Sequence, residues 1–180
     1  MSKGRLTAYT DAILAIIATI LVLSLPDLNS FSYHALASHW QAYIIYVITF
    51  LQLMAIWLNH HNLFAGLKKI TSGIFWANAI WLLVISFLPY AVKWVGEYPN
   101  KWQPETFYVF IIVLGSVMFS WLRVIAGRTN GFKVKIRNWI YVIFVPAVIV
   151  TYFIPFFGIV TAAFLIINLI MNPMDRDLLD

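Results

Sequence analysis

The sequence predicts an all-α polytopic membrane protein with six transmembrane helices in a single transmembrane domain, residues 1–180. Of the 180 residues, 62% are hydrophobic and only 11% are charged, whereas soluble proteins carry about 25% charged residues. The mean hydropathy is +0.85. Long stretches are apolar on all sides and not on one helical stripe, which is typical of contact with lipid. A lipid bilayer is therefore the expected solvent of this chain.

The first apolar segment, residues 6–25, contains no proline or glycine and ends at Pro26. Its length is close to the roughly 20 residues that cross a bilayer as a helix. A cleaved signal peptide is the alternative, because Lys3 and Arg5 precede the apolar run. However, Asp11 interrupts that run and no A-x-A cleavage site follows it. We predict that this segment is a transmembrane helix that stays in the protein.

Five further spans follow along the chain. A last apolar block is too long for one helix, and Pro155 with Gly158 marks a hairpin near its middle. Because the two resulting spans are short for a bilayer of about 30 Å, a five-span or re-entrant arrangement stays open. The predicted spans after the first are residues 36–67, 73–95, 106–126, 138–154 and 156–172.

The basic residues gather on one side of this topology. Only Lys93 and Lys101 fall on the opposite side. The positive-inside rule then predicts a multi-pass protein of the cell membrane with both termini in the cytoplasm. This distribution also accounts for the net charge of +5, so we expect no nucleic-acid partner. The residues on the basic side are Lys3, Arg5, Lys68, Lys69, Arg123, Arg128, Lys133, Lys135, Arg137 and Arg176.

A few polar residues lie inside predicted spans, where a charged side chain costs about 2.5–3.5 kcal/mol at mid-depth. Arg5, Asp11, the histidines His60 and His61, and Asn78 share one membrane depth in the predicted topology. They are expected to form a hydrogen-bonded cluster that clamps three helices, or else to carry protons or bind ions. The pattern does not decide which histidine faces Asp11.

Enzymatic chemistry is not supported by the sequence. His60 and His61 point about 100° apart on a helix, so both cannot face one metal ion. The chain has no cysteine, no G-x-S-x-G element, no glycine-rich phosphate loop and no paired catalytic carboxylates. We therefore expect neither a bound metal, nor a cofactor, nor an enzyme.

An apolar stripe runs along the first span. Its members are spaced by four, three, four and three residues, which suits packing around a shared axis. A span that is apolar everywhere contains such a stripe by default, so helix packing or lipid contact are equally consistent with it. The stripe comprises Tyr9, Ile13, Ile16, Ile20 and Leu23, with Thr19 beside it.

Three motifs in the first half of the chain resemble those of the transmembrane protein 175 family of potassium channels. Tyr9 and Thr10 replace the family's Phe and Ser, and the second half resembles the family only in its pattern of spans. The similar segments are Arg5-x-x-x-Tyr9-Thr10-Asp11 for R-x-x-x-F-S-D, Trp57-x-x-His60-His61-x-x-Phe64 for W-x-x-H-H-x-x-F, and Asn78 with Phe87-Leu88-Pro89-Tyr90 for N…F-L-P-Y.

This resemblance implies a homotetramer whose four first helices line a central pore for potassium ions. It implies that Ile16 narrows the pore, that Ile20 and Leu23 form further apolar rings, and that Thr19 favours potassium over sodium. No TVGYG filter is present, so the expected selectivity is modest. The supporting polar network implied by the family comprises Arg5, Tyr9, Thr10, Asp11, Trp57, His60 and Asn78.

Two alternatives stay open from the sequence. A proton-coupled or other secondary transporter would need a central substrate site, often marked by helices that Gly or Pro breaks near mid-membrane. The first span has no such break. A non-conducting membrane scaffold would use the same polar cluster and apolar stripe only for packing.

Overall fold

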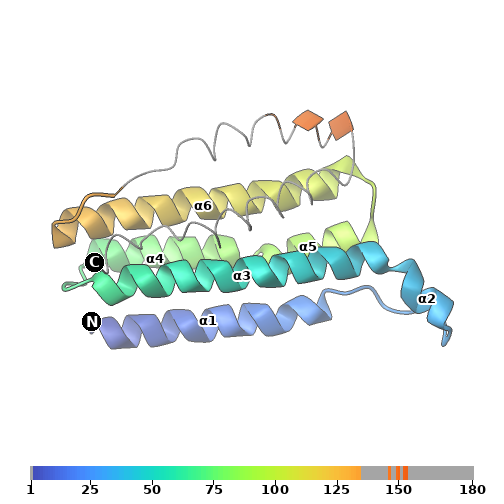
Figure 1. Cartoon of the computed structure of the whole chain (residues 1–180), viewed down its shortest axis with the longest axis horizontal. Coiled ribbons are helices and arrows are strands. Elements are labelled where there is room, and N and C mark those ends of the chain that lie inside the picture. Colours follow the sequence, from blue (N-terminus) through green and yellow to red (C-terminus); the bar gives the residue numbers. More distant parts are fainter. Residues whose placement is uncertain (1, 135–145, 147–148, 151, 154–180) are drawn as a thin grey trace.

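In the computed structural model of the protein, residues 2–134, 146, 149–150 and 152–153 are described, and the elements they form are all helices. The all-α prediction is therefore confirmed for this part of the chain. Figure 1 shows the long helices side by side, with α1 and α6 on opposite sides and α2 projecting at one end. The helices are α1 (Lys3–Leu23), α2 (Tyr33–Ser38), α3 (Trp40–Gly66), α4 (Ser72–Ile85), α5 (Leu88–Glu97) and α6 (Trp102–Asn130).

Among the described residues, four helical segments are long and apolar enough to cross a membrane. They are α1, α3, the combined segment Ser72–Glu97 and α6, and they correspond in order to the first four predicted spans. The predicted spans 138–154 and 156–172 lie almost entirely outside the described residues. The count of six spans therefore stays a prediction.

Two of the predicted spans are divided in the structure. The predicted span 36–67 begins inside the short helix α2, and His39 separates α2 from α3. The predicted span 73–95 consists of α4 and α5, because Pro89 has no N–H to donate to the Ile85 carbonyl one turn earlier. The Phe87 N–H instead bonds the Val84 carbonyl at 3.2 Å, which tightens the backbone at the junction.

The helices pack through large apolar side chains and, between α4 and α6, through a tight contact at a glycine. α6 packs on α4 and α5, whereas α1 packs on α3, α4 and α5. Trp81 and Tyr108 are among the largest fully buried side chains. Gly115 on α6 faces α4, where an added Cβ would lie 2.7 Å from the Ile85 Cδ1 atom. A larger residue at Gly115 would displace either the Ile85 side chain or one of these two helices.

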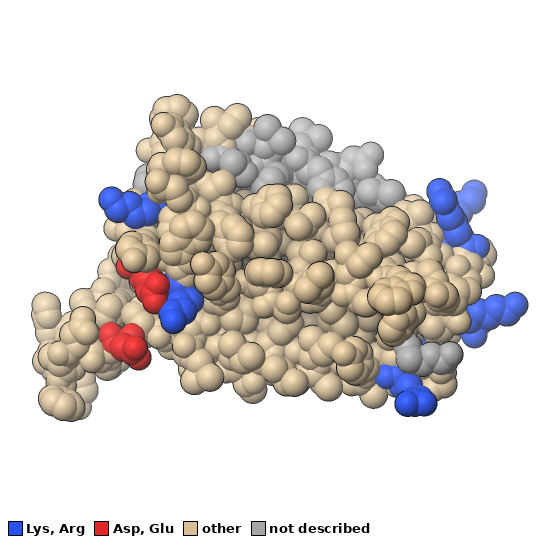
Figure 2. All heavy atoms as spheres, turned by 180° about the vertical axis from the view of Figure 1, so that it is seen from behind, with Lys and Arg blue, Asp and Glu red and all other residues tan. Residues whose placement is uncertain are grey.

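The two ends of the bundle differ in charge. The start of α1, the α3–α4 turn and the end of α6 meet at one end, because Lys3 bonds Leu67 and Asn130 bonds Lys68. Figure 2 shows lysine and arginine without acidic neighbours at that end, whereas acidic and basic side chains mix at the other. There Lys93 pairs with Glu97 at 3.7 Å. We call the first the basic end.

Candidate functional site

Helix α1 has a buried face and an exposed face. The buried face points into the bundle and consists of Leu6, Thr10, Leu14, Ile17 and Leu21. On the other face lie four members of the predicted stripe. The exposed fractions are 62% for Tyr9, 57% for Ile16, 42% for Ile20 and 78% for Leu23, whereas Ile13 is half-buried. The stripe is thus an apolar surface that this chain alone leaves uncovered.

Thr19 adds a hydroxyl group to this exposed face. Its Oγ1 atom donates a hydrogen bond of 2.8 Å to the carbonyl oxygen of Ile16, one turn earlier in α1. Because a hydroxyl has only one hydrogen, the oxygen can otherwise act only as an acceptor. An exposed oxygen that is free only to accept can contact a cation.

Behind the exposed face, a buried chain of hydrogen bonds joins three helices. The Asn78 Nδ2 atom on α4 donates to Thr10 Oγ1 on α1 at 2.8 Å. The Asn78 Oδ1 atom accepts from His60 Nε2 on α3 at 3.0 Å. All three side chains are at most 1% exposed. The His60 ring is stacked between Phe64 and Trp81, at centroid distances of 4.1 and 5.2 Å.

Asp11 makes a separate contact at the edge of this chain. Its Oδ1 atom accepts a hydrogen bond of 2.9 Å from the Trp57 indole Nε1. His61 is exposed and its ring lies 5.6 Å from that of Trp57. Arg5 is exposed and forms no ion pair with Asp11. The structure thus brings Thr10, His60 and Asn78 together and joins Asp11 to Trp57, but leaves Arg5 and Tyr9 outside both groups.

A further contact, which sequence reasoning missed, fixes the start of α1. The Lys3 Nζ atom donates hydrogen bonds of 2.8 Å to the Ala65 carbonyl and 3.0 Å to the Leu67 carbonyl. A cation at the carbonyl end of a helix is favourable, and here the helix is α3. The residue type and its place before an apolar run do not reveal this partner, because the contact joins residues far apart in sequence.

These contacts set the register of α1 against α3. Lys3 lies opposite Ala65, and Asp11 lies opposite Trp57. Eight residues forward along α1 therefore correspond to eight residues backward along α3. Continued at the same rise, this register puts Ile16 at the level of Gln52 on α3. That level is about 20 Å along α1 from Lys3. The predicted constriction therefore lies deep in the membrane-spanning part of the helix.

Sequence reasoning also missed buried polar residues near this level. Thr49 Oγ1 donates to the Ile45 carbonyl at 2.7 Å and lies 2.8 Å from the Tyr108 hydroxyl. Gln52 is 2% exposed and its Oε1 atom has no hydrogen-bond partner. The available signal was the presence of Thr49 and Gln52 in the middle of an apolar span, where polar residues call for partners.

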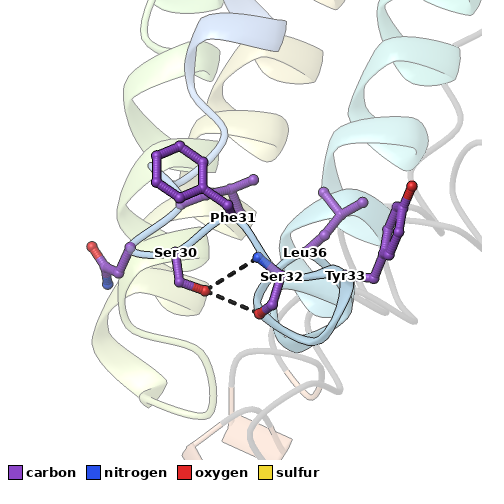
Figure 3. A pocket seen from close by; sticks show the side chains of 7 residues that line it. Ser30, Phe31, Ser32, Tyr33 and Leu36 are labelled. Atoms are coloured by element: carbon purple, nitrogen blue, oxygen red, sulfur yellow. Dashed lines mark hydrogen bonds between the residues drawn. The ribbon is translucent and has the colours of Figure 1, made fainter.

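A surface hollow of about 480 Å³ lies elsewhere, in the segment that joins α1 to α2 and in α2 itself. Figure 3 shows that its walls come from this one segment, with Ser30 bonded to Ser32 at 3.0 Å between the hydroxyls. No charged residue lines the hollow. Within the described part of the chain, no group of three His, Asp or Glu side chains could hold a metal ion. The exposed face of α1 is therefore the candidate site.

Comparison with known proteins adds a family match. Residues 5–89 match the model of the family described as endosomal/lysosomal potassium channel TMEM175. This range contains the motifs on α1 and α3, and the motif on the α4–α5 segment except its last residue, Tyr90.

Two similar proteins differ in how much of them the chain covers. A curated protein named a potassium channel, from Chryseobacterium sp. (strain P1-3), is 30% identical over 164 residues, which are 91% of this chain and 84% of that protein. A protein from Danio rerio named endosomal/lysosomal proton channel TMEM175 is 31% identical over 105 residues. Those residues are 56% of this chain but only 20% of the Danio rerio protein.

A solved structure resembles the whole fold. The crystal structure of a lysosomal potassium-selective channel TMEM175 homolog from Chamaesiphon minutus has a TM-score of 0.79 and 19% sequence identity. The match covers 94% of this chain and 97% of that chain. The two proteins therefore share their fold over nearly their whole length.

Proposed function

Since the chain belongs to the TMEM175 family of potassium channels, we propose that it is a potassium-permeable channel whose ion path is lined by α1. Four copies of the chain surround the path, each contributing the exposed face of its first helix. The basic end faces the cytoplasm of a cell membrane, as the distribution of lysine and arginine favours.

One observation carries this proposal, namely the composition of the exposed face of α1. Elsewhere the bundle exposes large aromatic side chains, for example Trp76, Phe110 and Trp121, which are suited to lipid. Beyond Tyr9, the exposed face of α1 has only aliphatic residues and Thr19. Aliphatic rings of uniform shape fit a narrow passage that closes when it loses its water.

In the proposed mechanism, rings of Ile16, Ile20 and Leu23 form a dry constriction. Ions are blocked while the passage is narrow, and a small rotation or dilation of the four helices lets water and ions enter. The Thr19 hydroxyl is the polar group at this level, so potassium is preferred over sodium only modestly. The constriction has no ring of carbonyl groups that could replace the hydration shell of the ion, and Thr19 alone replaces little of it.

The polar contacts behind α1 hold the helix in position in this proposal. Lys3 fixes its start to the end of α3. Thr10 and Asp11 fix its next turns to Asn78 and Trp57. The exposed face keeps its direction because these three attachments occupy the side of α1 that points away from the ion path.

The experiment that tests the proposal measures passive potassium and sodium flux into liposomes that contain the purified chain. Potassium flux is expected, and Ile16→Asn is expected to raise conductance because it wets the constriction. Val117→Asn is the control, since this side chain is also exposed but belongs to α6, which lies on the opposite side of the bundle from α1 (Figure 1). No flux under any gradient would contradict the proposal.

Flux measurements on the same liposomes distinguish a channel from a secondary transporter and from a non-conducting scaffold. A secondary transporter would give saturable flux that follows a proton gradient, without single-channel events. A scaffold would form oligomers without any permeability. Proton flux should be recorded in parallel with a pH-sensitive dye, because the similar Danio rerio protein is named a proton channel.

A further inference from the structure

Four cationic side chains lie at one corner of the basic end. Lys68 and Lys69 form the turn between α3 and α4, and Arg128 and Lys133 flank the end of α6. All four are exposed. We call these four residues the basic corner.

Asn130 holds the two halves of the basic corner together. Its Oδ1 atom accepts hydrogen bonds from the backbone N–H groups of Lys68 at 2.9 Å and Lys69 at 2.8 Å. Its Nδ2 atom donates to the carbonyls of Lys69 at 3.2 Å and Ala126 at 3.0 Å. Three of these four hydrogen bonds join segments about 60 residues apart, and the fourth lies within α6, so the backbone of the α3–α4 turn is held against the end of α6.

The basic corner has no acidic partner among the described residues. The described carboxylates nearest to this end belong to Asp11, which is bonded to Trp57 on α3. The ion pair of Lys93 with Glu97 lies at the opposite end of the bundle. The four charges therefore repel one another without a compensating group from this part of the chain.

The cations of the basic corner are also not needed as hydrogen-bond donors to the carbonyl groups at the ends of α3 and α6 that accept other hydrogen bonds. The carbonyls at the end of α3 already accept hydrogen bonds from Lys3. At the end of α6, the Gly127 carbonyl accepts from the N–H groups of Gly131 and Phe132. At both helix ends these hydrogen bonds come from groups other than the side chains of the basic corner.

The position of the basic corner points to a lipid. It lies where α3 ends, α4 begins and α6 ends. These helical segments are long and apolar enough to cross a membrane, so we expect their ends at the level of the lipid headgroups. α6 lies on the side away from α1 (Figure 1), so the half of the corner at the end of α6 lies away from the proposed ion path, whereas Lys68 follows Leu67, whose carbonyl accepts from Lys3 on α1. Clusters of lysine and arginine beside a transmembrane helix attract acidic lipids.

We propose that the basic corner binds the phosphate-bearing headgroup of an acidic phospholipid. The proposal does not depend on conduction, because a membrane protein of any function would present the same corner to the bilayer. Each lysine or arginine is expected to strengthen binding about fivefold.

The test uses the full chain purified in neutral detergent. Binding of phosphatidylglycerol and phosphatidylcholine is compared by native mass spectrometry and by the shift in Tm. We expect preferential binding of phosphatidylglycerol, and its loss in the variant with Lys68, Lys69, Arg128 and Lys133 all changed to Gln. The control is Lys93→Gln with Lys101→Gln, which removes cations from the opposite end and should leave the preference unchanged.

Several outcomes would overturn the proposal. One is equal binding of the two lipids by the unmodified chain. Another is an undiminished preference for phosphatidylglycerol in the four-residue variant. A third is a loss of this preference in the control that equals the loss in the four-residue variant. A matching Tm shift with inorganic phosphate alone would also overturn it, since the site would then take a soluble anion. If the four-residue variant does not fold, Lys69→Gln and Lys133→Gln replace it, and each alone must weaken binding.

Discussion

Asn78 on α4 donates a hydrogen bond of 2.8 Å to the hydroxyl of Thr10 on α1, although 68 residues separate them in the chain. The same amide accepts from His60 on α3. α1, which carries the exposed stripe, is therefore attached to two other helices through one buried side chain. Together with the contacts of Lys3 and Asp11 on α3, this attachment gives α1 a defined height and rotation.

Asn78→Ala should destabilise the protein by about 1–3 kcal/mol, because it leaves the Thr10 hydroxyl and His60 Nε2 without partners in an apolar interior. The measurement is thermal unfolding of the purified protein in detergent. Asn29→Ala, at an exposed position between α1 and α2, is the control and should change Tm little. Equal Tm values for the two variants would show that the buried amide does not hold the helices.

The polar residues around Asn78 were predicted in part from the sequence. Their common depth in the membrane follows from the order of the spans. The start of the first span, the end of the second and the start of the third all lie on the same side of the membrane. Which of them touch does not follow, since it depends on the rotation of each helix. His60 thus turned out to face Asn78 while His61 is exposed, and Arg5 lies apart from Asp11 although only six residues separate them.

Thr19→Val should lower the preference of the proposed channel for potassium over sodium by about two- to tenfold, the worth of one hydrogen-bonding group. The hydroxyl bonds only its own helix, through the Ile16 carbonyl, so folding should be unaffected. The permeability ratio is measured in liposomes under opposed potassium and sodium gradients.

Thr7→Val is the matched control for Thr19. Thr7 makes the same kind of bond within α1, to the Lys3 carbonyl at 3.1 Å, but lies three turns nearer the basic end. The permeability ratio should not change in this variant. A ratio unaffected by either substitution would remove Thr19 from the proposed selectivity mechanism.

Loss of the hydrogen bond between Thr49 and Tyr108 should cost more stability when Thr49 is replaced than when Tyr108 is replaced. Thr49 donates its hydrogen to the Ile45 carbonyl, so the Tyr108 hydroxyl must be the donor between the two side chains. Tyr108→Phe removes that donor and leaves Thr49 bonded, which should cost about 1 kcal/mol. Thr49→Val leaves a buried hydroxyl without an acceptor, which should cost about 1–3 kcal/mol.

Thermal unfolding of the two single variants and of the double variant measures this asymmetry. The double variant should be no less stable than Thr49→Val alone, because the orphaned hydroxyl is then gone. A larger loss for Tyr108→Phe than for Thr49→Val would contradict the assigned direction of the bond.

The helical class and the first four spans could be predicted because they follow from apolar length, which is a local property of the chain. The division of the third span could not, although Pro89 was visible, because a proline in a membrane helix is tolerated when neighbouring helices support the freed carbonyl. Family membership was predicted from three short motifs and is confirmed by the comparisons. Lys3 and Thr49 were missed because their partners lie about 60 residues away.

Gly115→Ala should loosen the contact between α4 and α6. The added Cβ would lie 2.7 Å from Ile85 Cδ1, closer than real atoms of this kind approach, so either the Ile85 side chain or one of the helices must shift. Overpacking of this sort costs about 1–3 kcal/mol. The shift should appear as a lower Tm in thermal unfolding. Gly4→Ala is the control, since an added Cβ there meets nothing within 4 Å.

A second substitution tests whether the clash itself is the cause. Ile85→Val removes the Cδ1 atom that the new Cβ would meet, so it should restore part of the stability lost by Gly115→Ala. Alone, Ile85→Val should cost about 0.5–1.5 kcal/mol, because it leaves a small cavity beside Gly115. The double variant should therefore be more stable than the sum of the two single effects implies. Strictly additive losses would mean that Gly115 matters for another reason than its approach to Ile85.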